Sequence, residues 1–465
     1  MSRVARGGET LEYTVSDLEQ WNDIIEEKVK EVGLNYYPQE FEIINYNDML
    51  AYEVYVGMPS MYPHWSFGKA YEKLRTLYNY NLTGLPYEMV INSDPCIAYL
   101  MKDNTLLLQI LTIAHVYGHN DFFKNNRLFK GATDARYTVE MFKNHADIIR
   151  SYINDPSIGY EEVEKMLNAA HALKFQTNRA IGVKDLTDEE IRVRKMEDYR
   201  NINNYDSPVI PRVKPKPPEM EKIPQEPVED ILGFIAKYGD LVEWQKNVIE
   251  IVRDETKYFI PQVETKIMNE GWASYWHYNI LKRLDLPQKL HLEFIKRHND
   301  VIVPLQGSIN PYFLGFEIYK DLVQKYGEEK IFEVRLLERD ESFLRRFLTK
   351  ELCDKLNLFQ YVKRDKNYVI DEISDDEGWK EIRDTLSSSC GMGSIPNIRV
   401  VDMSMLDKTL TLEHVFDGRE LQMQYAVETI KHIVDLWRHK VVLYTNLDGK
   451  VSKIICDENK KIIYE

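Results

Sequence analysis

Residues 104–125 have the sequence NTLLLQILTIAHVYGHNDFFKN, which predicts the helix around which the fold is built. Asn104 or Thr105 can cap its first turn, because these side chains accept hydrogen bonds from backbone N–H groups that lack partners. Apolar residues then occur on every side of the helix axis, which is typical of a buried helix. The segment therefore predicts a core helix that carries His115 and His119.

A β-hairpin is predicted immediately before this helix. Residues 87–92 and 96–101 are two short apolar runs, and Ser93-Asp94-Pro95 between them is a typical turn sequence. The second run leads directly into the buried helix.

Helical spacing of apolar residues dominates the remainder of the first 340 residues, whereas strand-like runs alternate with helices after that point. We therefore predict a mainly α-helical body at residues 1–340, with a short β-hairpin or sheet, followed by a small α+β domain at residues 341–465. Residues 204–228 are rich in proline and charge, a composition that favours extended, solvated backbone. An exposed linker or insertion is expected there.

The overall composition narrows the class of protein. The chain has 465 residues, of which 44% are hydrophobic and 29% charged, as in globular proteins with a sizeable core. Its net charge of −15 disfavours nucleic acid as a partner, because such binding depends on Lys and Arg neutralising phosphates. No segment has the pattern of a signal peptide or a membrane-spanning helix. The four cysteines are scattered, so a cytoplasmic location is expected.

His115 and His119 are the first candidate metal ligands. They are four residues apart on a predicted helix, so their imidazoles project from one face about one turn apart. A buried histidine pair needs polar partners, because burial without them is costly. A divalent metal, with zinc as the expected ion, would supply such a partner, and so would an ordinary hydrogen-bonded core. The spacing alone does not separate these alternatives.

A third candidate ligand lies in the segment from Asn269 to Ser274. Glu270, Ser274 and His277 recur on one face of a predicted helix. Together with the two histidines, this segment resembles the glutamate-zincin pattern, in which a glutamate from a later helix completes a zinc site and its neighbours support it. The resemblance implies a zincin-like active-site helix, although Ser274 stands where that pattern has aspartate.

The usual general base of the zincin pattern is absent, because Val116 follows His115 where the HExxH motif has glutamate. A carboxylate from elsewhere in the chain could accept the proton of a water molecule instead. The candidates for this role are Asp121, Glu140 and Glu164. The candidates for stabilising an oxyanion are Tyr275 and His277.

Further polar residues are candidate pocket residues. One group lies on two consecutive predicted helices and could form a second metal or proton-transfer site, or an ordinary hydrogen-bond network; its members are Glu140, His145, Glu164 and His171. Another candidate is the aromatic-rich loop that enters a helix near residue 65 and carries His64 and Lys69. It is either a recognition loop or a structural aromatic corner.

The chain resembles the bacterial stage V sporulation protein R (SpoVR) family. The segments that carry the resemblance are Tyr62-Pro63-His64-Trp65-Ser66-Phe67-Gly68-Lys69, Ala114-His115-Val116-Tyr117-Gly118-His119-Asn120-Asp121-Phe122-Phe123, Ala169-Ala170-His171-Ala172-Leu173, Asn269-Glu270-Gly271-Trp272-Ala273 and Asn310-Pro311-Tyr312. They run in family order, and the C-terminal part is similar to the smaller domain that ends family members. The family pattern also lacks a glutamate after the first histidine.

This resemblance implies a protein of the mother-cell cytoplasm in spore-forming bacteria that takes part in making the spore cortex, a peptidoglycan layer. Two hypotheses about its activity follow. The first is a metal-dependent hydrolase that acts on an amide bond of a peptidoglycan precursor or peptide. The second is a noncatalytic regulator or scaffold that binds cortex-assembly proteins and uses the polar cluster for structure.

Overall fold

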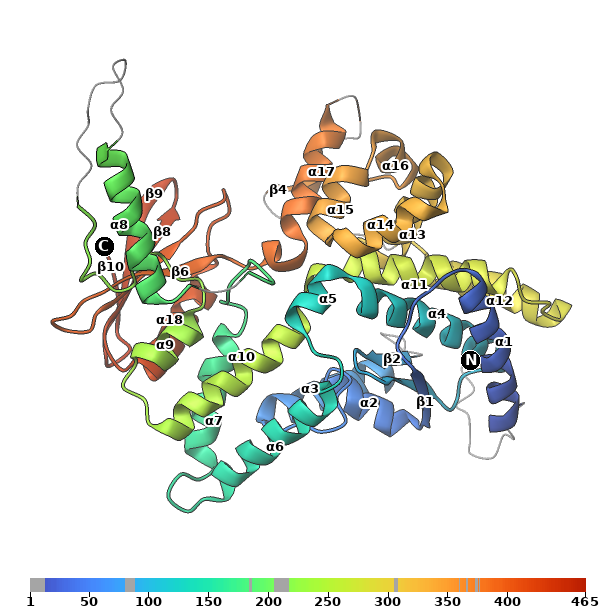
Figure 1. Cartoon of the computed structure of the whole chain (residues 1–465), viewed down its shortest axis with the longest axis horizontal. Helices are drawn as coiled ribbons and strands as arrows, with labels where there is room; N and C mark the ends of the chain where they lie inside the picture. Colours follow the sequence, from blue (N-terminus) through green and yellow to red (C-terminus); the bar gives the residue numbers. More distant parts are fainter. Residues whose placement is uncertain are drawn as a thin grey trace. The chain divides into compact units, whose positions relative to one another are not determined.

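The computed structural model describes residues 13–79, 88–183, 186–204, 217–304, 308–358, 360–364, 367–372, 375 and 377–465 (Figure 1). Helices dominate it, a small sheet lies in the N-terminal part, and a larger sheet with a helix lies near the C-terminus. This confirms the predicted fold class. The chain forms two compact units, Met1–Ile148 with Tyr258–Ser394, and Ile149–Lys257 with Ile395–Glu465. The predicted domain boundary near residue 340 stays a prediction.

The first unit is built around α4 (Leu106–Asn125), as the sequence predicts. The side chain of Thr105 caps this helix by accepting a hydrogen bond from the backbone N–H of Leu108. Nearly every residue of α4 is buried, including His115 and His119, which are 0% and 6% exposed. Neighbouring elements cover the helix on all sides, so its polar side chains must find partners inside the protein.

A three-stranded sheet lies beside α4. The predicted hairpin is confirmed, since β2 (Glu88–Ile91) pairs antiparallel with β3 (Cys96–Met101). A further strand, β1 (Gln39–Ile44), pairs parallel with β3 and gives the order β1-β3-β2. Both β2 and β3 contact α4. The first residue of β2, Glu88, is thereby placed next to the helix.

Close packing brings α11 (Lys266–Leu281) against α4 on one side and α13 (Pro311–Tyr326) on another. A Cβ atom on Gly118 would lie 2.7 Å from the Cα atom of Ala273, so these two backbones are nearly in contact. A Cβ atom on Gly271 would lie 2.4 Å from the backbone of Gly315. Small residues at both crossings are thus required for this helix spacing.

The start of α11 is held by Asp340, the first residue of α15 (Asp340–Phe347). Its carboxylate accepts hydrogen bonds from the backbone N–H groups of Ile267 and Met268, at 2.8 and 2.9 Å. These N–H groups belong to the first turn of α11 and have no partner within the helix. Asp340 therefore fixes where α11 begins, four residues before Glu270.

The remaining elements of the first unit complete its core. They are α1 (Val15–Glu31), α2 (Tyr46–Val54), α3 (Trp65–Asn79), α5 (Arg127–Ala132), α12 (Gln288–Val301), α14 (Glu328–Leu337), α16 (Lys350–Lys355), the hairpin β4 (Gln360–Arg364) and β5 (Asn367–Glu372), α17 (Gly378–Ser389) and η1 (Gly391–Ser394). The chain passes from one unit to the other within α6 (Thr138–Asn154) and α10 (Glu243–Glu264).

The second unit contains a five-stranded sheet of order β10-β9-β8-β7-β6. Its strands are β6 (Ile398–Met403), β7 (Leu410–His414), β8 (Val441–Leu447), β9 (Lys450–Cys456) and β10 (Ile462–Tyr464), and its helices are α7 (Tyr160–Leu173), α8 (Asp188–Asn204), α9 (Ile231–Tyr238) and α18 (Met423–Trp437). Strands β7 and β8 are parallel, and α18 makes the crossover between them. The other pairs are antiparallel.

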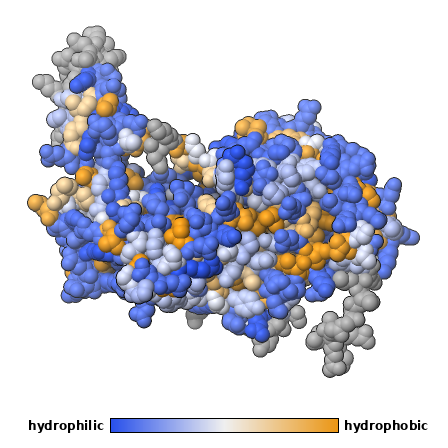
Figure 2. Space-filling view, turned by 60° about the horizontal axis from the view of Figure 1, so that its bottom comes forward, coloured by the Kyte–Doolittle hydropathy of each residue, from blue (hydrophilic) through white to orange (hydrophobic). Residues whose placement is uncertain are grey.

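Residues 205–216 of the proline-rich segment predicted to be a linker lie outside the described residues. At its C-terminal end, Gln225 is buried and Val228 forms a bridge to Val400 of β6. Among the described helices, none combines the length and apolar composition needed to cross a bilayer. The face drawn in Figure 2 is mainly hydrophilic with smaller apolar patches, while the largest side chains, such as Trp272 and Trp276, are buried.

Replacing Gly118 with alanine tests the close contact between α4 and α11. Alanine favours a helix, but its methyl group would meet the backbone of Ala273, and overpacking of this kind costs about 1–3 kcal/mol. Gly68→Ala is the matched control, because Gly68 lies in α3 with open space around it. We expect Gly118→Ala to lower the thermal unfolding midpoint and Gly68→Ala to raise it slightly, by about 0.5–1 kcal/mol of stability. Equal effects of the two variants would contradict the close packing.

Asp340 makes stability depend on pH. Burial raises its pKa to about 8 and outweighs the two backbone hydrogen bonds, which lower it. Between the ordinary pKa near 4 and this value, the folded protein holds a proton that the unfolded chain has released, so stability falls as pH rises through this window. We expect Asp340→Asn to gain stability relative to wild type between pH 5.5 and pH 9 in calorimetry. The exposed control Asp300→Asn should have the same stability as wild type at pH 5.5 and at pH 9. If Asp340→Asn also shows no change relative to wild type between these pH values, Asp340 does not cause the pH dependence.

Candidate metal centre

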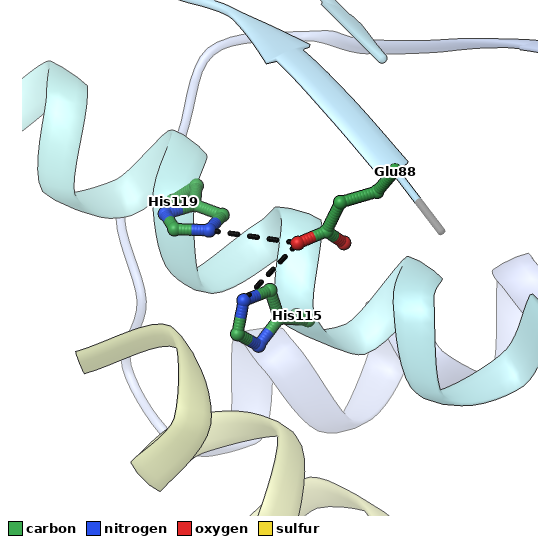
Figure 3. Close-up of side chains that lie close together, drawn as sticks. All are labelled: Glu88, His115 and His119. Atoms are coloured by element: carbon green, nitrogen blue, oxygen red, sulfur yellow. Dashed lines mark ion pairs between the residues drawn. The ribbon is translucent and has the colours of Figure 1, made fainter. Parts of the chain in front are cut away.

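Three side chains from two elements converge beside α4. His115 and His119 lie on successive turns of this helix, and Glu88 approaches them from β2 (Figure 3). One ligand atom from each lies within 4.8 Å of the others. The Oε1 atom of Glu88 is 3.1 Å from Nε2 of His115 and 3.7 Å from Nε2 of His119. One carboxylate thus faces both imidazoles.

Glu270 of α11 contributes a second carboxylate to the same point. Its Oε2 atom lies 3.9 Å from Nε2 of His115 and 3.5 Å from Nε2 of His119. Ligands of a tetrahedral zinc ion at their usual bond lengths are about 3.3 Å apart. The four nitrogen–oxygen distances, 3.1 to 3.9 Å, lie around this value, and three of them are too long for good hydrogen bonds. The donor set therefore fits a divalent metal better than direct hydrogen bonding.

Both histidines use their other ring nitrogen for a contact behind the site. Nδ1 of His119 lies 2.9 Å from Oδ1 of Asn269, which can only accept a hydrogen bond. His119 therefore carries its proton on Nδ1 when neutral and presents the lone pair of Nε2 to the carboxylates. Nδ1 of His115 lies 2.8 Å from Nδ1 of His277. Orientation of a ligand histidine through its second nitrogen is a regular feature of metal sites.

The electrostatics of the cluster favour a cation. Burial raises the pKa of Glu88 to about 7 and also raises the pKa of Glu270. Burial lowers the pKa of His119, but Glu88 and Glu270 outweigh it and raise this pKa to about 9. Among the described residues, Oε2 of Glu88 and Oε2 of Glu270 have no hydrogen-bond partner. The two buried carboxylates therefore favour a positive charge between them, and a divalent metal would carry such a charge.

His115 differs from its neighbour. Burial, together with the nearby His119 and His277, lowers its pKa well below the ordinary value, despite a hydrogen bond with the backbone of Ala273. His115 is therefore neutral and able to offer a lone pair at physiological pH.

The site opens toward its carboxylates. The side chains of Glu88 and Glu270 are 10% and 18% exposed, whereas His115 is fully buried and forms the floor. Tyr312, at the start of α13, is half-buried; its ring lies over His115 with a centroid distance of 6.1 Å, and its hydroxyl group hydrogen-bonds Glu270. The acids and this phenol therefore form the more exposed side of the cluster.

Residues 12–395 match the family model described as SpoVR like protein, and residues 396–448 match the SpoVR-like C-terminal domain. The chain belongs to the SpoVR family. It is also 35% identical to the uncharacterized protein YcgB of Escherichia coli (strain K12), over 95% of this chain and 94% of that protein. No solved structure matches. SpoVR membership confirms the resemblance carried by the sequence motifs and supports a sporulation-related protein.

In this SpoVR chain, several predicted site residues have partners away from the cluster. Asp121 is fully buried and accepts hydrogen bonds from the backbone N–H of Asn35 and the indole N–H of Trp272, beside the guanidinium of Arg335. It joins α4 to α11 and α14, and its role as a base stays a prediction. Both ring nitrogens of His277 face other histidines, and its role in stabilising an oxyanion stays a prediction.

The other candidates lie on several different elements. Tyr275 packs edge-on against Trp276, and Ser274 is buried with no hydrogen-bond partner for its hydroxyl oxygen among the described residues. The candidates that lie on other helices or on the loop before α3 are Glu140 and His145 on α6, Glu164 and His171 on α7, and His64 and Lys69 at α3. Glu164 and His171 belong to the second unit. Their functional roles stay predictions.

Glu88 is the cluster residue that the sequence analysis missed. It lies at the edge of an apolar run that predicts only a strand, and no spacing rule connects a strand residue to a histidine pair on a later helix. The usable signal is its chemistry: a carboxylate within a short apolar strand must find a polar partner once that strand is packed. In the hairpin register, Glu88 pairs with Leu100, shortly before α4 begins.

Neutralising one carboxylate should stabilise the metal-free protein. Two acids face one protonated imidazole there, so Glu88→Gln leaves a balanced pair between Glu270 and His119. In excess chelator, we expect this variant to gain about 1–2 kcal/mol, and the double variant Glu88→Gln with Glu270→Gln to lose stability because it leaves a buried cation alone. The exposed β1 residue Glu42 provides the control Glu42→Gln, expected within about 0.5 kcal/mol of wild type. A destabilised single variant would count against an excess of buried negative charge.

Proposed function

We propose that this chain is a metal-dependent hydrolase that acts on an amide bond, with zinc as the expected ion. The observation that carries the proposal is the convergence of two imidazole nitrogens and two carboxylate oxygens, 3.1 to 3.9 Å apart across the pairs. When bound, a divalent metal polarises a carbonyl group and activates water. The residues that would hold it are His115, His119 and Glu88, with Glu270 beside them.

The second carboxylate supplies what the missing HExxH glutamate would do. A catalytic zinc site needs three protein ligands and one open position, and this cluster has one acid more than that. The shorter distances favour Glu88 as the ligand. Glu270 would then accept a proton from water. The hydroxyl group of Tyr312, which hydrogen-bonds Glu270, would stabilise negative charge that develops on the substrate.

The proposed substrate class rests on the family resemblance. SpoVR membership supports the spore cortex as the biological setting, and therefore an amide bond of a peptidoglycan precursor or peptide as the bond cleaved. A place in the mother-cell cytoplasm rests on the same resemblance. These assignments depend on the family, whereas the metal centre depends on the geometry of this chain.

A structural metal in a noncatalytic scaffold is the second candidate. If Glu88 and Glu270 both bind, the four protein ligands close a tetrahedral site, which is the arrangement of structural zinc. Such a centre would tie β2, α4 and α11 together, and partner proteins for cortex assembly would bind elsewhere on the molecule.

The test begins with elemental analysis of the full chain, purified without chelator or metal-affinity resin. We expect about one equivalent of zinc, iron or manganese, and its loss in His115→Ala and His119→Ala. The matched control is His414→Ala, which removes a buried histidine of the second unit whose Nδ1 atom lies 2.9 Å from Oγ1 of Thr445. The metal centre would be falsified if the wild-type protein and all variants take up none of these metals.

The two carboxylate variants separate enzyme from scaffold. If the chain is an enzyme, we expect Glu88→Ala to lose the metal and Glu270→Ala to keep it. The Glu270→Ala variant should then release amino groups from muramyl peptides about 100-fold or more slowly than wild type, which is the usual contribution of a general base. For the scaffold, both variants lose metal and stability together, and loaded wild-type protein cleaves none of these peptides. If both variants keep the metal, the enzyme and the scaffold hypotheses are both contradicted.

A further inference from the structure

A chain of three buried histidines extends from the metal centre into the protein. His115 of α4, His277 of α11 and His298 of α12 are 0%, 0% and 3% exposed. Nδ1 of His115 lies 2.8 Å from Nδ1 of His277, and Nε2 of His277 lies 2.8 Å from Nδ1 of His298. Each contact has hydrogen-bond length, so in each one ring must donate and the other accept.

A neutral imidazole has one N–H group, so the chain can point in only two directions. All three rings are buried, and burial favours the neutral form of an imidazole. In one direction His115 donates from Nδ1, His277 donates from Nε2, and His298 accepts. In the other direction every proton sits on the opposite nitrogen, and Nε2–H of His115 points at Glu88.

A metal at Nε2 of His115 permits only the first direction. Coordination uses the lone pair of Nε2, so the proton of His115 must be on Nδ1. His277 then has to accept at Nδ1 and therefore carries its proton on Nε2. That proton needs an acceptor, and Nδ1 of His298 is the atom placed to receive it.

We propose that His277 and His298 are positioning residues for the metal ligand His115, and that metal binding fixes the proton positions of all three rings. The inference rests on the proposed metal centre and extends it to His298 of α12, which reaches the cluster through His277. His298 raises the affinity for the metal because its Nδ1 atom accepts the proton of His277 in the hydrogen-bond pattern that makes the lone pair of Nε2 of His115 available to the metal.

The surroundings of His298 hold its ring in place for this role. Tyr278 lies 4.5 Å and Phe316 5.1 Å from it between ring centroids, and Phe294 packs against it as well. The faces of these rings are apolar, so they hold the imidazole by packing. Without His298, the Nε2–H group of His277 would be a buried donor with no acceptor, which is rarer and costlier in proteins than an unpaired acceptor.

The first test compares zinc affinity of the full chain with that of two variants. His298→Phe keeps an aromatic ring in the aromatic surroundings but removes the acceptor, and His298→Asn keeps an acceptor near the position of Nδ1. We expect the Phe variant to bind zinc about tenfold or more weakly in a competition titration, and the Asn variant to recover most of this loss. A merely structural role predicts instead that both variants lose stability equally with and without zinc.

The second test reads the proton positions directly. In protein labelled with ¹⁵N-histidine and loaded with zinc, the nitrogen shifts should show protons on Nδ1 of His115 and on Nε2 of both His277 and His298. His414, which contacts Thr445 in the second unit, serves as an internal control whose pattern should be the same with and without zinc.

The outcomes distinguish this inference from the function on which it rests. If wild-type protein binds no metal, the metal centre and the inference both fail. The inference alone is overturned if zinc binds but His298→Phe binds it as tightly as wild type. It is also overturned if zinc binds and His277 or His298 carries its proton on Nδ1.

Discussion

The close approach of α11 to α4 is the constraint on which the site depends. Gly118 lies one residue before His119, and Ala273 lies three residues after Glu270, so their near-contact sets the distance between the two helices that supply imidazoles and carboxylate. Gly271 and Gly315 allow α13 to approach from another side and place Tyr312 over His115. A larger side chain at either crossing would push the helices apart and shift the side chains of the cluster relative to one another.

The buried charge of the cluster works against folding, and other parts of the first unit offset it. Asp121, Trp272 and Arg335 form a polar contact that joins α4, α11 and α14, and Asp340 holds the first turn of α11. The large aromatic side chains of α11 fill the surrounding core. Such an arrangement, in which a rigid core holds unfavourable charge in place, is typical of functional sites and is rarely kept for stability alone.

The sequence predicted the elements of the site better than their contacts. The capped, apolar segment around α4 and the turn before β3 have strong local signals, so the helix, the hairpin and the histidine pair could be found without a structure. The helix spacing also identified Glu270, because its pattern repeats on one face. Glu88 could not be found this way, since only the tertiary contact of β2 with α4 brings it to the histidines. The same limit explains why the contacts of Asp121 with other elements were not predicted. Its partners Asn35, Trp272 and Arg335 lie 86 to 214 residues away in the chain.

The absence of a glutamate at position 116 has a structural consequence beyond the choice of base. Val116 is fully buried, so an acid there would face the core. Here the carboxylates come from β2 and α11 instead, and the centre exists only when hairpin and both helices are packed together. A motif on a single helix keeps two ligands and a base in register through local hydrogen bonds alone. A metal held by these side chains would therefore depend on tertiary packing, and a change that loosens the contact between α4 and α11 would weaken its binding before it unfolds the protein.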